Sequence, residues 1–220
     1  KRTGWYLQQF IKLPYANICK KDYYMTWDSD TVPVMNVNMF NNDKPYFDLK
    51  NEYHKPYFKT ISKILNINKC VNESFISEHM LFNKKYVMQM IKDIESNNNI
   101  KGNYFFEKII NAIDIKDLNK SGFSEFETYG SYVMTKYPDS YNLRKWKSLR
   151  EGIFYFPLPL NKNAANWIAK KYNAISFENH DSLTKLNKIW NNNFCYKYIS
   201  LNFITIIMYP YMIIRKYFFK

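Results

Sequence analysis

The stretch of sequence that decides the fold is Tyr23-Tyr24-Met25-Thr26-Trp27-Asp28-Ser29-Asp30-Thr31-Val32-Pro33. Its aromatic, β-prone first half predicts a short strand over residues 23–27, buried in the centre of a mixed sheet. Proline cannot continue a central ladder, so the extended segment ends at Pro33. Asp28 and Asp30 therefore stand just beyond a strand, where open α/β sheets bind their ligands. Carboxylate oxygens suit Mg²⁺ or Mn²⁺, which keep open positions for substrate phosphates. The alternative is a loop with two solvated aspartates.

The composition is that of a folded protein. The chain has 220 residues, enough for one substantial domain or for one domain with an appendage. Hydrophobic residues make up 46% of the chain, which excludes a disordered protein. Glycine occurs only 5 times, and the sequence has neither G-x-G-x-x-G nor a Walker motif. A glycine-rich phosphate loop is therefore not expected.

The net charge of +13 allows three kinds of partner: nucleic acid, a membrane surface, or anionic substrates such as nucleotide sugars. The basic residues are dispersed among acidic ones, and Lys, Asn and Ile are abundant, as an A+T-rich genome would give. We therefore predict no nucleic-acid partner. Cys19, Cys70 and Cys195 are scattered, which predicts no disulfide framework and no zinc ribbon. Such cysteines are typical of reduced cytosolic thiols and favour a cytoplasmic location.

Apolar periodicity predicts alternating helices and strands, and hence a layered α/β domain. We expect this domain to cover residues 1–190, followed by an apolar appendage over residues 191–220. Helices are predicted over residues 4–13, 56–65, 84–95, 104–113, 125–137, 164–171 and 182–190. Strands are predicted over residues 23–27, 45–49 (an edge strand), 153–156 and 174–177, and residues 74–82 predict a strand or an approach loop. Asn83 and Ser124 are expected to cap the helices that follow them, with Glu127 completing a capping box at Ser124.

The C-terminal segment Leu201–Ile214 is apolar but contains Asn202, Thr205 and Pro210. It is shorter than the ~20 residues that span a bilayer. Lys197 precedes the segment, and Arg215 and Lys216 follow it. The segment predicts either a buried helix or an interfacial anchor that makes peripheral contact with a membrane surface.

Pairs of polar side chains stand at the edges of apolar runs. Each pair, taken alone, is explained by surface carboxylates or by a hydrogen-bonded structural histidine. Together, in one α/β domain, they favour a shared acidic cleft. The pairs are Asp28 with Asp30, Glu52 with His54, Glu78 with His79, and Glu125 with Glu127.

A set of stretches in a fixed order resembles a little-characterised family of glycosyltransferases from bacteria and large viruses. Its fold is the nucleotide-diphospho-sugar transferase type, called GT-A. The resemblance covers roughly residues 4–152. It rests on Gly4-Trp5-Tyr6-Leu7-Gln8-Gln9-Phe10-Ile11-Lys12-Leu13, Trp27-Asp28-Ser29-Asp30-Thr31-Val32-Pro33, Glu52-Tyr53-His54-Lys55-Pro56-Tyr57-Phe58, Ser74-Phe75-Ile76-Ser77-Glu78-His79-Met80-Leu81-Phe82, Gly122-Phe123-Ser124-Glu125-Phe126-Glu127-Thr128-Tyr129-Gly130, Leu143-Arg144-Lys145-Trp146 and Ser148-Leu149-Arg150-Glu151-Gly152.

The resemblance implies a metal-dependent transfer of a sugar from a nucleotide-diphospho-sugar donor to a saccharide, lipid or protein acceptor. It implies that Asp30 is the direct ligand of Mn²⁺ or Mg²⁺. Asp28 would help through the ribose or a metal-bound water, and His180 would complete the metal shell. Glu127 or Glu125 would serve as the base or bind the acceptor. Donor and acceptor contacts would come from Glu52, His54, Glu78, His79, Tyr129, Lys145 and Trp146.

One feature departs from the resemblance. A GT-A domain begins with a βαβ unit upstream of the Asp-x-Asp strand, and this sequence has about one helix there. We therefore expect a GT-A-like mixed sheet, flanked by helices, that lacks the first nucleotide-binding unit. Two alternatives to an active transferase follow. One is a non-catalytic remnant of such a domain, and the other is a basic protein that binds a membrane surface or nucleic acid.

Overall fold

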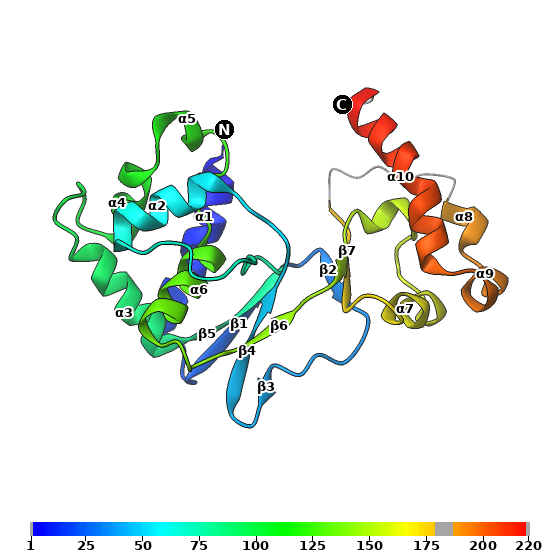
Figure 1. Cartoon of the computed structure of the whole chain (residues 1–220), viewed down its shortest axis with the longest axis horizontal. Helices are drawn as coiled ribbons and strands as arrows, with labels where there is room; N and C mark the ends of the chain where they lie inside the picture. The colour runs from blue at the N-terminus through cyan, green and yellow to red at the C-terminus, as the bar shows by residue number, and fades with distance from the viewer. Residues whose placement is uncertain (1, 179–186, 219–220) are drawn as a thin grey trace. The chain divides into compact units, whose positions relative to one another are not determined.

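The computed structural model describes residues 2–178 and 187–218, which form two compact units (Figure 1). The first unit comprises Lys1–Trp27 and Asn38–Trp146, and the second comprises Asp28–Val37 and Lys147–Lys220. The chain therefore passes between the units three times, after Trp27, after Val37 and after Trp146. The boundary expected at residue 190 lies inside the second unit.

The strands of the first unit form two small groups. Strand β1 (Tyr23–Trp27) pairs antiparallel with β5 (His79–Asn83). Strand β4 (Lys44–Leu49) lies between β3 (Phe40–Asn41) and β6 (Asn142–Lys145), antiparallel to β3 and parallel to β6. The mixed α/β class is as predicted.

Two expectations about these strands are wrong. Strand β1 is not central, because it pairs only with β5 among the described residues, and Tyr24 is its only buried side chain. The segment before β1 is helical and supplies no further strand. Strand β4 was expected at an edge because of Pro45. It pairs on both sides instead, because Pro45 lies opposite Phe40, before the ladder to β6 begins at Tyr46.

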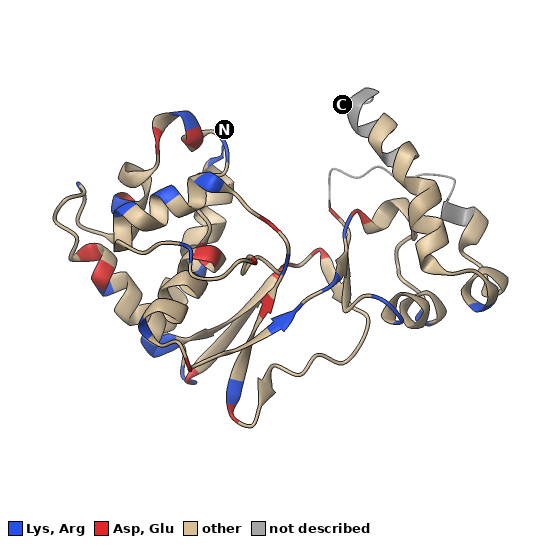
Figure 2. Cartoon of the chain, viewed as in Figure 1, with Lys and Arg blue, Asp and Glu red and all other residues tan. Residues whose placement is uncertain are grey.

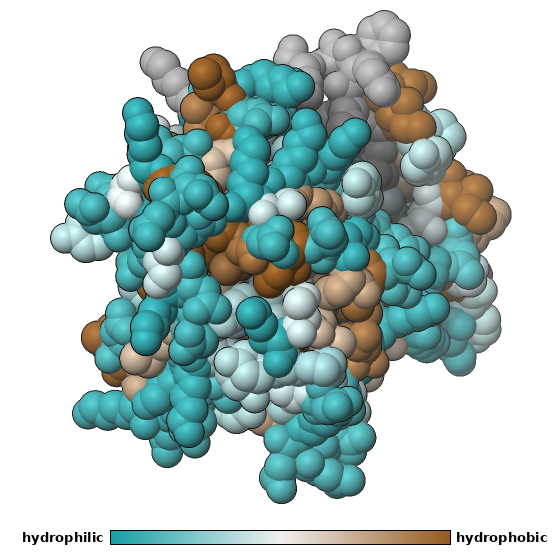
Figure 3. Space-filling model, turned by 60° about the vertical axis from the view of Figure 1, so that its left-hand side comes forward, coloured by the Kyte–Doolittle hydropathy of each residue, from teal (hydrophilic) through white to brown (hydrophobic). Residues whose placement is uncertain are grey.

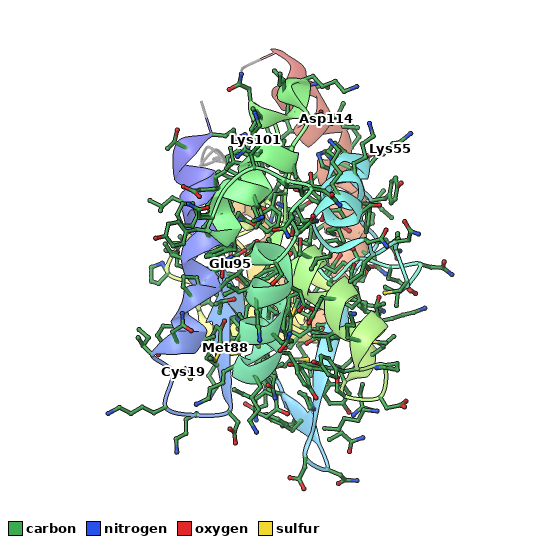
Figure 4. The ribbon with its side chains drawn as sticks, turned by 90° about the vertical axis from the view of Figure 1, so that its left-hand side faces the viewer. Cys19, Lys55, Met88, Glu95, Lys101 and Asp114 are labelled. Carbon is green, nitrogen blue, oxygen red and sulfur yellow. The ribbon has the colours of Figure 1, made fainter. Side chains whose placement is uncertain are left out.

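Helices cover the strands of the first unit, and their ends follow the capping signals. Asn83 accepts hydrogen bonds from the backbone N–H groups of Lys85 and Tyr86, and Ser124 accepts one from Glu127. In Figure 4, Lys55 marks the start of α2, Glu95 the end of α3 and Asp114 the residue before α5. The helical elements are α1 (Thr3–Lys12), the 3₁₀ helix η1 (Pro14–Asn17), α2 (Lys55–Leu65), α3 (Lys84–Glu95), α4 (Phe105–Ala112), α5 (Ile115–Leu118) and α6 (Glu125–Lys136).

Helix α6 is the centre of the first unit's core. It is buried along most of its length, including its glutamates. Gly130 lets it approach the neighbouring chain closely, because a Cβ built at this position would lie 2.2 Å from the ring of Phe75. Outside this core, the face shown in Figure 3 is mostly hydrophilic, with hydrophobic residues in separate patches.

The second unit has a small sheet in the order β2-β8-β7. Strand β8 (Ala174–Ser176) pairs antiparallel with β2 (Thr31–Pro33) and parallel with β7 (Ser148–Leu149). The strand predicted over residues 153–156 is wrong. A 3₁₀ helix, η2 (Gly152–Phe154), forms there, because Tyr155 and Phe156 donate backbone hydrogen bonds to the carbonyl of Gly152. The helices are α7 (Lys162–Ala169), α8 (Asn187–Trp190), α9 (Asn193–Tyr198) and α10 (Leu201–Phe218).

Helix α10 is buried along one side only. Leu201, Ile204 and Met208 join the second unit's core, whereas most of its other apolar residues are exposed. The buried helix that was one of the two expectations is therefore found on one side of α10 only. Within the described residues, no helix combines the length and apolar character needed to cross a membrane.

Candidate functional site

Polar side chains meet where strands β1, β4 and β6 end in the first unit. Trp27, the last residue of β1, lies opposite His79, the first residue of β5. Asp48 near the end of β4 lies beside Arg144 of the parallel strand β6. Because His79 also reaches Asp48, the carboxyl ends of these three strands share one edge. Such an edge is where α/β proteins commonly bind ligands.

The Asp48 carboxylate is the centre of this edge. Nε of Arg144 donates to Oδ1 of Asp48 at 2.6 Å, and Nη2 of Arg144 donates to Oδ2 at 2.7 Å, which is a bidentate pair. Nε2 of His79 lies 2.9 Å from the same Oδ2. Burial acts to raise the pKa of Asp48, but the hydrogen bonds and charges of Arg144 and His79 outweigh it and hold the pKa below its ordinary value.

The His79 ring is held on both its nitrogens. Nδ1 lies 2.9 Å from the carbonyl oxygen of Ser77, which can only accept. An ionised Asp48 can also only accept, so both hydrogen bonds form when each ring nitrogen carries a proton. The two bonds fix the orientation of the ring.

Two tryptophans enclose the His79 ring. The ring of Trp27 stacks on it with centroids 4.5 Å apart and an interplanar angle of 21°. Trp146 lies at the same centroid distance with an interplanar angle of 64°. Together the two indoles leave His79 almost wholly buried. The tryptophans therefore fix the ring and keep water from its bond to Asp48.

Glu78, the residue before His79, has an unusual backbone conformation. Its φ of 64° lies in the left-handed region, which a non-glycine residue adopts at a cost of about 1–3 kcal/mol. Its carboxylate forms an ion pair with Lys50 and accepts a hydrogen bond from Nε1 of Trp146 at 3.2 Å. These bonds hold the strained residue, and strained backbone of this kind is concentrated at functional sites.

Glu127 holds the loop that leads to Glu78. Its Oε2 accepts hydrogen bonds from Oγ of Ser74 at 2.8 Å and from the backbone N–H of Phe75 at 3.0 Å. The backbone of Ser74 in turn pairs with that of Lys50. The side chain is 1% exposed, and burial raises the pKa of its carboxyl group. Among the described residues, its Oε1 has no hydrogen-bond partner, although Nζ of Lys69 lies 3.9 Å away.

Comparison with known proteins identifies the family to which the chain belongs. Residues 2–188 match the model described as "Family of unknown function (DUF6492)". The chain belongs to this family. No curated protein and no solved structure matched the chain. The DUF6492 match extends from α1 beyond β8, so it includes every sequence-predicted site residue, but it assigns no activity to any of them.

Two residues predicted for the site lie inside the core of this DUF6492 chain. Glu125 is as buried as Glu127 and accepts a hydrogen bond from Nζ of Lys12 at 2.6 Å, which joins α6 to α1. The hydroxyl of Tyr129 accepts a bond from the backbone of Asn83 at 2.8 Å and lies 2.9 Å from that of Tyr141. Burial raises the pKa of Tyr129 well above its ordinary value. In the described structure these groups hold secondary-structure elements together.

The remaining predictions within the first unit fall into two groups. Glu78, His79 and Trp146 come together as the pattern suggested, and Lys145 ends β6 beside them with an exposed side chain. Glu52 and His54 lie in the loop before α2, and Glu52 is exposed. The ring of His54 packs at 4.6 Å from that of Tyr57, and its buried Nε2 has no hydrogen-bond partner among the described residues.

Asp28 and Asp30 begin the second unit. Their segment is a turn, in which the backbone N–H of Thr31 donates to the carbonyl of Asp28 at 3.0 Å. The side chain of Asp30 is exposed, and its Oδ1 accepts a bond from Oγ1 of Thr31 at 3.3 Å. His180, the predicted third ligand, lies outside the described residues. Within the described part of the chain, no group of three or more His, Cys, Asp and Glu side chains is arranged to hold a metal.

Sequence reasoning missed Asp48, Lys50 and Trp27 as members of the cluster, and it named Arg144 only within a stretch that carries the resemblance. One signal was available. Asp48 interrupts the apolar run from Tyr46 to Leu49, and a charge inside a buried strand needs a partner. The identity of that partner depended on the parallel pairing of β4 with β6, which the sequence alone does not specify.

Proposed function

We propose that this chain is a metal-dependent glycosyltransferase that uses a nucleotide-diphospho-sugar donor. The observation that carries the proposal is the shared edge of β1, β4 and β6, where the basic residues Arg144 and Lys145 end β6. A diphosphate is the anionic group that such an edge suits. Asp28 follows Trp27 of β1 directly in the chain, and the side chain of Asp30 is exposed.

The exposed carboxylate of Asp30, with Asp28, would hold Mg²⁺ or Mn²⁺. Two carboxylates are enough, because Mg²⁺ commonly takes one or two from the protein and the rest from substrate phosphates and water. When bound, the metal neutralises the nucleoside diphosphate as it leaves. This chain's own part is to orient the donor. Arg144 and Lys145 supply positive charge at the end of β6, while the tryptophans keep His79 and Asp48 fixed.

The proposal assigns neither Glu125 nor Glu127 as the base. A base must come within hydrogen-bond reach of the acceptor hydroxyl, and both carboxylates are 1% exposed and bonded to neighbouring elements. They support the site through the helix and the loop that they hold. The donor sugar is transferred to a saccharide, lipid or protein acceptor.

Isothermal titration calorimetry with UDP- and GDP-sugars tests the proposal, with and without Mn²⁺. We expect donor binding only in the presence of the metal. Asp30→Asn keeps the shape of the side chain and removes its charge, so donor affinity should fall at least ~tenfold, which corresponds to 1.4 kcal/mol. Asp139→Asn is the matched control, because Asp139 is also exposed but lies beyond the end of α6.

Two results would contradict this function. One is that Asp30→Asn keeps full metal-dependent binding, which would remove the Asp-x-Asp turn from the site. The other is that no nucleotide sugar binds at any metal concentration while the chain is folded by circular dichroism.

A further inference from the structure

An apolar stripe runs along the exposed side of α10. Because an α-helix has 3.6 residues per turn, residues spaced by three and four positions share a face. Leu201, Ile204 and Met208 form the buried face. The opposite face has Ile206 at 70% and Ile207 at 53% exposed. The stripe consists of Phe203, Ile206, Ile207, Pro210, Ile213 and Ile214, all exposed.

No charged residue interrupts this stripe. From Leu201 to Ile214, α10 contains no Lys, Arg, Asp or Glu, as Figure 2 shows. By contrast, α9 has Lys197 in its last turn, and Lys170 directly follows α7. A contiguous exposed apolar surface of this kind is unusual unless something covers it.

A basic pocket adjoins the first residues of α10. It has a volume of about 460 Å³, and its lining includes Lys170, Lys171 and Lys197 with Trp167 and Tyr198 but no acidic residue. Lys171 donates a hydrogen bond to the side chain of Asn202 in the first turn of α10. The pocket and the exposed stripe therefore meet on the same helix, within the same unit.

The sequence around α10 is basic throughout. After Asp181 the chain contains no Asp or Glu. The basic residues in this part are Lys185, Lys188, Lys197, Arg215, Lys216 and Lys220. A surface that covers the stripe must therefore be apolar in its interior and negatively charged at its boundary.

We propose that the second unit docks on an anionic phospholipid bilayer. The stripe of α10 lies in the boundary between headgroups and acyl chains, and Lys170, Lys171 and Lys197 contact the lipid phosphates. Binding of this kind gains from buried apolar area and from attraction between basic residues and anionic lipids. The helix lies in the interface and does not cross it, in agreement with its length.

Charge argues against two other occupants. A second copy would bring two basic surfaces without acidic residues face to face, and like charges in contact repel. The phosphates of a nucleic acid would pair with the lysines. They would not cover the apolar stripe, because phosphate groups favour water or basic side chains over apolar ones.

Co-sedimentation of the full 220-residue chain with vesicles tests this proposal. We expect binding to vesicles that contain phosphatidylserine, weaker binding to pure phosphatidylcholine, and release of the bound chain by high salt. Ile206→Glu with Ile207→Glu should raise the dissociation constant at least ~tenfold, because it puts charges into the apolar boundary. Lys170→Gln and Lys197→Gln should each raise it about fivefold, the effect of losing one basic residue near the surface.

Matched variants in the first unit serve as controls. Ile115 is 86% exposed, so Ile115→Glu adds the same kind of charge away from α10. Lys101→Gln removes an exposed charge in the same way. Both should bind vesicles like the unchanged chain, and circular dichroism should show that every variant is folded.

Specific results would overturn the proposal. It fails if phosphatidylserine does not strengthen binding, or if the Ile206 and Ile207 variant binds as well as its Ile115 control. It also fails if the chain self-associates in solution through this stripe, or if it is retained on DNA and not on vesicles. None of these readouts involves metal or nucleotide sugar, so failure here leaves the proposed transferase function intact.

Discussion

Replacing Glu127 by Gln and by Ala separates the charge of this buried side chain from its hydrogen bonds. Both donors, Oγ of Ser74 and the N–H of Phe75, contact the single oxygen Oε2. The amide oxygen of a glutamine can accept both, so Glu127→Gln keeps these bonds, removes the charge and puts an amide NH2 group in place of Oε1. Alanine removes both bonds and leaves the buried N–H of Phe75 unsatisfied.

The expected sizes follow from these contacts. An unsatisfied buried donor costs about 1–3 kcal/mol, and the space left by the missing side chain adds to this. We expect Glu127→Ala to lower the free energy of unfolding by about 2–4 kcal/mol. Glu127→Gln should be as stable as the original chain or more stable at neutral pH, because burial raises the pKa of Glu127 and so disfavours its charged form.

The dependence on pH has a definite sign. A carboxyl group whose pKa is raised in the folded state lowers stability as pH rises from its unfolded-state pKa, about 4.3, through the folded value. The advantage of Glu127→Gln should therefore be largest at pH 8 and disappear as the pH falls toward 4. Urea unfolding followed by circular dichroism at several pH values measures this advantage. If the glutamine variant is as unstable as the alanine variant at pH 8, the charge is required and this reasoning is refuted.

Two further predictions concern the core and the strand edge. Gly130→Ala puts a Cβ against the ring of Phe75, so the free energy of unfolding should fall by about 1–3 kcal/mol. The control is Gly4→Ala, whose Cβ meets no neighbouring atom and should not lower that free energy. Equal stability of the two variants in urea would contradict the close approach of Gly130 to Phe75. Asp48→Asn breaks a buried pair with Arg144 and His79 and should cost about 3–5 kcal/mol. Because the pKa of Asp48 is lowered in the folded state, the stability that it contributes is complete above about pH 4 and is lost as pH falls through the folded pKa. The difference in free energy of unfolding between the original chain and Asp48→Asn should therefore shrink in acid. A difference that does not depend on pH would contradict the ion pair.

Local signals in the sequence determined most of the helices and their ends. Asn83 and Ser124 cap α3 and α6 as predicted, because a cap depends on residues only two or three positions apart. Strands β1 and β8 also form close to where apolar, β-prone runs occur. The Asp-x-Asp turn and the Glu78-His79 pair were recognisable for the same reason.

Only the tertiary structure decided how these pieces meet. Strand neighbours depend on contacts far apart in the sequence, so neither the outer position of β1 nor the inner position of β4 followed from the residues. The Asp48–Arg144 pair arises from the parallel alignment of β4 with β6. Glu127, which completed a capping-box pattern, turns its carboxylate to Ser74 and Phe75, because burial placed those donors within its reach. Sequence fixes which groups are available, and packing decides which of them become partners.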